Sequence, residues 1–170
     1  QAVTHRGTVP DAAIGNGEAT TKSFELYETE IANFIDSEGM NPGTQSVEEY
    51  TDFILDEVLD RLDSDDAENL VHNIWYCIDG SGARVQEADA RLIQTFNDNV
   101  LLVVTKSELM RKEQVESMMN SLLGLIDRYR IVMVSAENKS GLKQLLSKTE
   151  KISMDSMAAA EQELDSFRER

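Results

Sequence analysis

The chain is poor in cysteine, proline and basic residues, and it has no long apolar run. Its one cysteine, Cys77, rules out a disulfide within the chain and a metal site of several cysteines. No stretch approaches the ~20 apolar residues of a membrane span, and no signal-peptide pattern is visible. A lone thiol suits a reducing compartment, so we expect a cytoplasmic protein.

Acidic residues outnumber basic ones: 32 Asp and Glu stand against 16 Lys and Arg, for a formal net charge of −16. This balance disfavours non-specific binding to nucleic acid, which depends on clustered Lys and Arg. Many of the acidic residues lie at 48–68, where we favour a solvated helix face over a metal cluster. With 41% hydrophobic residues, the 170-residue chain has the composition of a globular domain.

Three apolar runs predict strands of a buried parallel sheet. The clearest is 100–104, with five consecutive apolar residues, and 74–78 and 131–134 are similar. Each run ends in small or polar residues. Because open α/β sheets bind ligands at the carboxyl ends of their strands, we expect a ligand site there.

Four amphipathic helices are predicted from apolar residues at helical spacing: 47–63, 85–96, 112–127 and 141–149. Ser46 is the expected N-cap of the first helix. Residues 154–170 predict a surface or linker helix, and alternating runs at 24–28 and 31–35 predict an antiparallel hairpin. The predicted fold class is therefore α/β, with a mostly parallel sheet, one antiparallel hairpin strand and helices on both faces.

Three short motifs follow predicted strands: Asp36-x-x-Gly39, Thr105-Lys106-Ser107-Glu108 and Ser135-Ala136. Their order and spacing resemble a GTPase domain of the translation-factor-related class, a P-loop NTPase fold. The chain looks most like small bacterial GTP-binding domains with a tryptophan in a central strand, here 73–79. The resemblance covers 1–150, with a switch-like loop at 1–22, and leaves 151–170 as a C-terminal helix or linker.

The resemblance implies a site for Mg²⁺ and the γ-phosphate of GTP. Thr21, with Thr20 as the alternative, matches the switch threonine that helps to hold Mg²⁺ and senses the γ-phosphate. Asp36 matches the aspartate that holds Mg²⁺, and Gly39 the glycine whose amide meets the γ-phosphate. A hydroxyl, a carboxylate and phosphates supply the hard oxygen ligands that Mg²⁺ prefers. Thr21 and Asp36 are thus the expected metal ligands, and Thr21 and Gly39 the expected catalytic residues.

The resemblance also implies a guanine site. Thr105 and Lys106 match the start of the N-K-x-D base-recognition motif, and Glu108 matches its final carboxylate. A carboxylate can accept both the ring N–H and the exocyclic amine of guanine, whereas adenine presents a different pattern. Lys106 would lay its stem along the base. Ser135 and Ala136 match the serine–alanine pair whose backbone amide meets the guanine oxygen.

Three departures from the family pattern limit the expected activity. The sequence has no G-x-x-x-x-G-K-[ST] phosphate loop, so its affinity for a triphosphate should be low. The base motif begins with Thr105 in place of Asn and ends with Glu108 in place of Asp. Met40 stands where several relatives carry a Gln that orients the attacking water, which suggests slow hydrolysis.

Without the phosphate loop, the resembled fold also lacks its first strand and first helix, and inner strands would expose unpaired edges. The economical expectation is a longer GTPase whose missing segment lies upstream of Gln1. The alternative is a degenerate domain that rearranges or dimerises. In that case the chain is a nucleotide-free interaction module. In either case we expect an unidentified protein partner to bind through the switch region.

Other readings of single motifs are weaker. Asp79-x-Ser81-x-Ala83 matches two positions of a metal-adhesion site but lacks the last hydroxyl. Asp79 with Lys106 could be the phosphoacceptor and lysine of a receiver domain, which also needs an early acidic pair that 1–22 does not supply. The two histidines, His5 and His72, are isolated, and Trp75, Tyr76 and Cys77 are expected in the core.

Overall fold

The computed structural model describes residues 24–29, 32–41, 43–62, 70–82, 84–96 and 99–168, with side chains described up to residue 158. The chain divides into two compact units, Gln1–Asp60 and Arg61–Arg170. Within the described residues, no helix is both long and apolar enough to cross a membrane.

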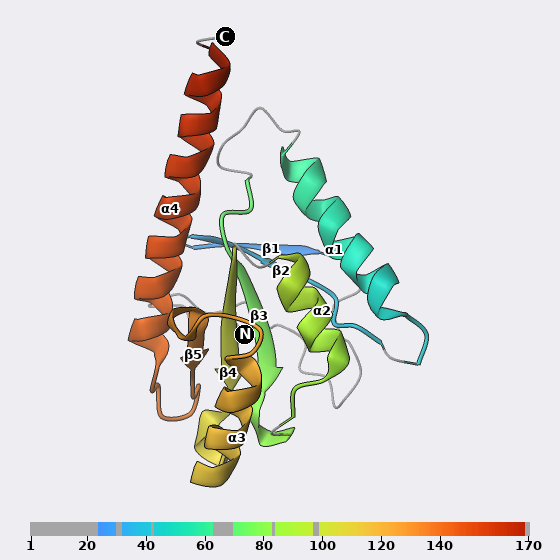
Figure 1. Cartoon of the computed structure of the whole chain (residues 1–170), viewed down its shortest axis with the longest axis vertical. Helices are drawn as coiled ribbons and strands as arrows, with labels where there is room; N and C mark the ends of the chain where they lie inside the picture. The colour runs from blue at the N-terminus through green and yellow to red at the C-terminus, as the bar shows by residue number, and fades with distance from the viewer. Residues whose placement is uncertain are drawn as a thin grey trace. The chain divides into compact units, whose positions relative to one another are not determined.

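The described residues of the first unit form a β-hairpin and one helix (Figure 1). Strands β1 (Glu25–Glu28) and β2 (Asn33–Asp36) pair antiparallel, and in the described residues they form a sheet of their own. The ring of Phe24 stacks on that of Phe53, with centroids 4.5 Å apart, which joins the hairpin to helix α1 (Val47–Leu62). The hairpin is therefore confirmed, and it forms a second sheet instead of adding a strand to the parallel one.

Helix α1 begins with a reciprocal cap. The Ser46 hydroxyl accepts from the backbone N–H of Glu49 at 3.1 Å, and the Glu49 carboxylate accepts from the N–H of Ser46 at 2.7 Å. Both bonds satisfy N–H groups that the first turn would leave unpaired, so the predicted N-cap is confirmed. The acidic side of the helix is exposed, as expected for a solvated face: Glu48, Glu49, Asp52, Asp56 and Asp60.

Replacing Ser46 with alanine should lower the free energy of unfolding by about 1 kcal/mol, because the Glu49 N–H loses its acceptor. Chemical denaturation followed by circular dichroism measures this loss. Thr44→Ala is the matched control, since the exposed Thr44 side chain makes no hydrogen bond within the described residues. Equal stability changes in the two variants would contradict the capping role of Ser46.

The second unit is a three-stranded parallel sheet in the order β3-β4-β5 with helices on both faces. Its strands are β3 (Ile74–Asp79), β4 (Val100–Thr105) and β5 (Ile131–Met133). Its helices are α2 (Glu87–Thr95), α3 (Lys112–Leu122) and α4 (Leu142–Arg168). The predicted α/β class is confirmed, and the elements follow the predicted order except at the end of the chain, where two predicted helices are one.

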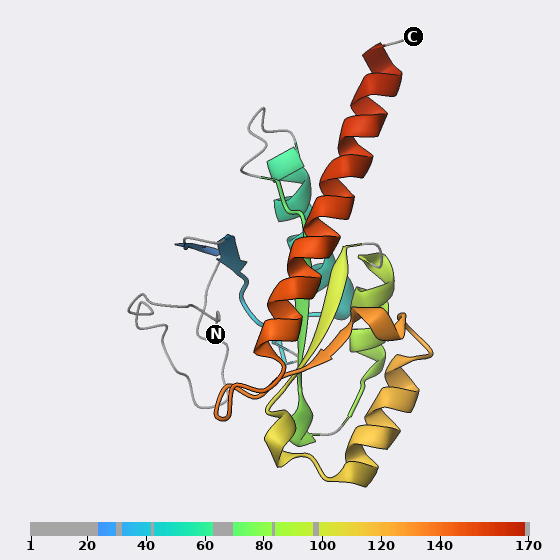
Figure 2. The ribbon, with the colours of Figure 1, turned by 90° about the vertical axis from the view of Figure 1, so that its left-hand side faces the viewer.

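Strand β4 lies at the centre of two cores. On one face, Val100, Leu102 and Val104 pack with buried residues of α2 and α3. On the other face, Leu101 and Val103 pack with buried residues of α4. Figures 1 and 2 show the resulting three layers, with α4 on one side of the strands and α2 and α3 on the other. An apolar residue at every position follows from burial on both faces.

Strand β3 is less buried than its composition predicts. Cys77 is exposed, so its assignment to the core is wrong. Trp75 and Tyr76 are half-buried, and the polar atom of each side chain makes a hydrogen bond to a neighbouring helix. Trp75 Nε1 donates to Thr149 Oγ1 of α4 at 2.8 Å, and the Tyr76 hydroxyl donates to Asp89 Oδ1 of α2 at 2.7 Å. The low burial of β3 follows from its position, because it is an outer strand of the described parallel sheet and only part of each of its faces is covered.

The two helices predicted at 141–149 and 154–170 are one continuous helix, α4. The intervening residues, 150–153, contain neither glycine nor proline, so nothing in the local sequence ends the first helix. Ile152 within this stretch is only 5% exposed and packs in the core against β4. Burial of Ile152 therefore extends the helix through the predicted break.

Candidate functional site

The carboxyl ends of the parallel strands bring two of the three motifs together. The Ser107 N–H donates to the Val134 carbonyl at 3.1 Å, and the Val134 N–H donates to the Val104 carbonyl at 2.8 Å. These bonds hold the loop after β4 beside the loop after β5. The end of β4 and these two loops carry the five residues predicted to recognise the base: Thr105, Lys106, Glu108, Ser135 and Ala136.

Lys106 adopts a backbone conformation that is unusual for a residue with a side chain. Its φ is 51° and its ψ is 37°, in the left-handed region, and it precedes a short 3-10 turn at Ser107–Leu109. Such a conformation costs free energy and persists only where surrounding contacts maintain it. One such contact is the Leu109 N–H donating to the Lys106 carbonyl at 3.1 Å. The turn redirects the chain sharply at the end of β4.

The Lys106 side chain reaches across to the end of the neighbouring strand. Its Nζ lies 2.6 Å from Asp79 Oδ2, and both side chains are about half exposed. The other carboxylate oxygen, Asp79 Oδ1, accepts from the backbone N–H of Ser81 at 2.8 Å and from the Ser81 hydroxyl at 2.6 Å. The Lys106 ammonium, together with the Ser81 donors, lowers the pKa of Asp79 below its ordinary value.

Asp79 is the residue of this site that the motifs alone do not assign to base recognition. It is the last residue of β3, and the sheet register pairs it with Thr105 of β4. The signal in the sequence was its place directly after an apolar run, one strand before the Thr105-Lys106 motif. In the sequence alone, Asp79 and Lys106 match only the phosphoacceptor and lysine of a receiver domain.

Gly80 allows the two strand ends to approach each other. A Cβ atom at Gly80 would lie 2.6 Å from the Thr105 carbonyl oxygen and 2.8 Å from Met110 Sδ. Both distances are shorter than a real Cβ contact, and the first involves backbone that cannot easily move. Glycine at this position therefore lets the 3-10 turn at Gly80–Gly82 contact the turn at Ser107–Leu109.

The loop after β5 is ordered around Ser135, whose side chain is fully buried. Its backbone N–H donates to the Ser140 carbonyl at 3.1 Å, and its hydroxyl accepts from the Asn138 N–H at 3.2 Å. The Asn138 side chain in turn accepts from the Ser140 N–H at 2.9 Å. The loop then enters α4 through Gly141, which has a φ of 74°. Ser135 thus shapes the loop and exposes the residue that follows it.

The polar groups on these loops that are available to a ligand include a carboxylate and a backbone N–H that match the predicted base contacts. Glu108 is exposed, and its carboxylate has no hydrogen-bond or ion-pair partner within the described part of the chain. Ala136 is also exposed, and within the same residues its backbone N–H makes no hydrogen bond. The loops therefore present an anionic acceptor and a neutral donor. A ligand that matches them needs donors and an acceptor together.

The Thr105 hydroxyl, unlike these two groups, already has a hydrogen-bond partner. Thr105 is half-buried, and its hydroxyl donates to the carbonyl of Ile78 at 3.3 Å, between the ends of β3 and β4. This bond gives Thr105 a structural part in joining the two strand ends.

The predicted Mg²⁺ and γ-phosphate residues lie in the first unit or outside the described residues. Asp36 ends β2, and Gly39 follows in the next loop; both are exposed. Thr20 and Thr21 lie outside the described residues. Among the residues that are described, no group of three or more His, Cys, Asp or Glu is placed to hold a metal ion. This finding does not test the implied magnesium site, because only one of its protein ligands is a carboxylate. A hydroxyl and phosphate oxygens complete its ligand shell.

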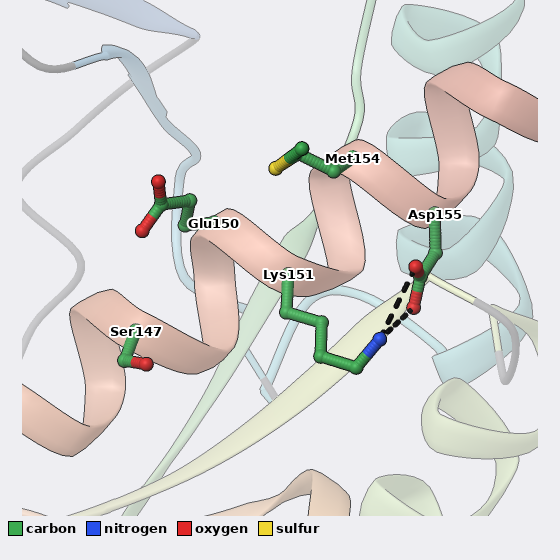
Figure 3. A pocket seen from close by; sticks show the side chains of 5 residues that line it. All are labelled: Ser147, Glu150, Lys151, Met154 and Asp155. Atoms are coloured by element: carbon green, nitrogen blue, oxygen red, sulfur yellow. Dashed lines mark hydrogen bonds and ion pairs between the residues drawn. The ribbon is translucent and has the colours of Figure 1, made fainter.

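A surface hollow elsewhere in the second unit does not include these residues. It is lined by five side chains of α4: Ser147, Glu150, Lys151, Met154 and Asp155. Figure 3 shows that all five extend from the same helix, with Lys151 paired to Asp155 at 2.9 Å. A hollow formed by one exposed helix offers no converging polar groups, so we assign no site to it.

The chain was compared with protein-family models, with curated proteins and with solved structures, and none of them matches it.

Proposed function

We propose that the loops after β4 and β5 bind a guanine base, and that the chain is part of a GTP-binding switch domain. The observation that carries this proposal is the pair of available groups on adjoining loops, the Glu108 carboxylate and the Ala136 N–H. One edge of guanine carries two donors, the ring N–H and the exocyclic amine, beside an acceptor oxygen. Glu108 would accept from both donors, and the Ala136 N–H would donate to the oxygen. Adenine carries an amine donor where guanine has the oxygen, so it would leave these groups poorly paired.

The remaining base-site residues would support these contacts. The Lys106 stem, held toward β3 by Asp79, would lie against the ring. The buried Ser135 would keep the loop in the shape that presents Ala136. For the phosphate end, Asp36 and Thr21 are the residues that we propose to hold Mg²⁺, and Gly39 to contact the γ-phosphate. Mg²⁺ would supply charge neutralisation of the phosphates.

Strong nucleotide binding requires phosphate contacts as well as base contacts. The 170 residues contain no G-x-x-x-x-G-K-[ST] sequence, whose amides and lysine cradle phosphates. We therefore expect this chain to bind nucleotide weakly, with a Kd on the order of 1 mM, which corresponds to about 4 kcal/mol of binding free energy. The base specificity should be visible in spite of the low affinity.

The test is a titration of the ¹⁵N-labelled chain with GDP and, separately, with ADP, followed by NMR. GDP should shift the amide signals of 105–109 and 135–137, and its affinity should exceed that of ADP by about tenfold, since the mismatched base leaves polar groups unpaired. Lys106→Ala and Glu108→Ala should each reduce the GDP response. Glu150→Ala, on the exposed face of α4, is the control.

Equal responses to GDP and ADP, or none to either, would contradict the proposal. The base-recognition residues would then be a relic of a nucleotide-binding ancestor. The chain would be better studied as an interaction module that keeps the α/β fold.

A further inference from the structure

The Asp79–Lys106 ion pair lies beside the proposed base site and fixes the position of a flexible charge. Lysine has a long unbranched stem with several rotatable bonds, so its ammonium is restricted only where an acceptor holds it. Here the acceptor is itself restrained, because Asp79 Oδ1 accepts two hydrogen bonds from Ser81 while Oδ2 holds Lys106 Nζ at 2.6 Å. Ser81, Asp79 and Lys106 thus form a connected chain of contacts across the ends of β3 and β4.

A second carboxylate, that of Glu108, lies close to Lys106 along the chain. Glu108 lies two residues beyond Lys106, in the 3-10 turn that Lys106 precedes, and it is exposed. Opposite charges attract even in the high dielectric at a protein surface, so a Lys106 ammonium released from Asp79 would be drawn toward Glu108. A Lys106–Glu108 pair would occupy the carboxylate oxygens that guanine needs. In the described part of the chain Lys106 pairs with Asp79, and the Glu108 carboxylate stays free.

We infer that Asp79 is a positioning residue for guanine recognition, which holds the Lys106 ammonium away from Glu108 and keeps the Lys106 stem in place beside the base. Asp79 makes no contact with the base in this assignment; it acts through Lys106. The inference rests on the proposed function, because it assigns Glu108 to the guanine donors. It adds a residue from β3 to a site otherwise made by the loops after β4 and β5.

The test uses Asp79→Asn, which keeps the size of the side chain and an oxygen that can accept from Ser81, but removes the charge that holds Lys106. We expect the affinity for GDP to fall about fivefold, because an exposed ammonium then competes for Glu108. In a Lys106→Ala background, Asp79→Asn should have no further effect. A merely structural Asp79 would weaken binding equally in both backgrounds, and that result would overturn the inference.

Asp155→Asn is the matched control. It removes the same kind of exposed Asp–Lys pair, between Asp155 and Lys151 at 2.9 Å, from a helix that contributes no residue to the two loops. This variant should bind GDP like the unmodified chain. A loss of affinity as large as that of Asp79→Asn would show a general charge effect and would overturn the inference.

A measurement without nucleotide separates this inference from the proposed function. The ¹³Cδ signal of Glu108 and the ¹⁵Nζ signal of Lys106 report their pairing by NMR. In Asp79→Asn both signals should move, with new contacts between the two side chains. If GDP does not bind the unmodified chain, the proposed function fails, and the moved signals still support the positioning of Lys106 by Asp79. Unmoved signals overturn it.

Discussion

Replacing Glu108 with glutamine is expected to change the preferred base from guanine to xanthine. Xanthine differs from guanine in carrying an oxygen in place of the exocyclic amine. The glutamine side chain has one oxygen, which can accept from the ring N–H, and one amine, which can donate to the new oxygen. The carboxylate of Glu108 is free within the described residues, so the exchange would not break an existing ion pair.

The expected size is a weakening of GDP binding by about 10- to 100-fold, as for the loss of a hydrogen bond to a charged group. Binding of xanthosine diphosphate should rise by a similar factor. Competition titrations by NMR measure both. Glu113→Gln is the control, because Glu113 is an exposed glutamate nearby in the chain, in the first turn of α3. If Glu108→Gln weakens all nucleotides equally, Glu108 does not read the base.

Replacing Gly141 with alanine should cause the largest loss of stability among single changes near the site. Gly141 has a φ of 74°, and a Cβ atom there would lie 2.0 Å from the Met133 carbonyl oxygen. The obstacle is backbone of β5, so relief requires the strand or the start of α4 to shift. We expect the free energy of unfolding to fall by about 2–4 kcal/mol, from the strained conformation and the overlap together.

Chemical denaturation of the whole chain measures this loss, with Gly124→Ala as the control. A Cβ atom at Gly124 would meet nothing closer than Ser121 O at 3.5 Å, an ordinary contact. The amide signals of 135–140 should also shift in Gly141→Ala, since Ser135 bonds to Ser140 directly before the glycine. A loss no greater than that of Gly124→Ala would contradict the close approach of Gly141 to β5.

The sequence by itself determined the class of the fold and the order of its elements. Periodicity sufficed because burial on both faces makes β4 apolar at every position, while each helix keeps one apolar face. The cap at Ser46 was also predictable, because its partners lie within three residues along the chain. Features that depend on neighbours in sequence can therefore be predicted from the sequence alone.

Features that depend on neighbours in space were decided only by the tertiary structure. Cys77 has the same apolar sequence context as the residues of β4, but β3 is an outer strand of the described parallel sheet and leaves it exposed. The continuity of α4 comes from the burial of Ile152 against β4. In the described residues the hairpin forms its own sheet, a matter of strand pairing that its alternating pattern does not encode.

The candidate site divides in the same way. The residues of the two loops could be named from the motifs, because parallel strands end at one edge of a sheet. The Asp79–Lys106 contact joins residues 27 positions apart, and its 2.6 Å distance depends on strand register and on the left-handed turn at Lys106. Motif spacing describes which groups follow each strand. Only the packing of β3 beside β4 decides which of those groups touch.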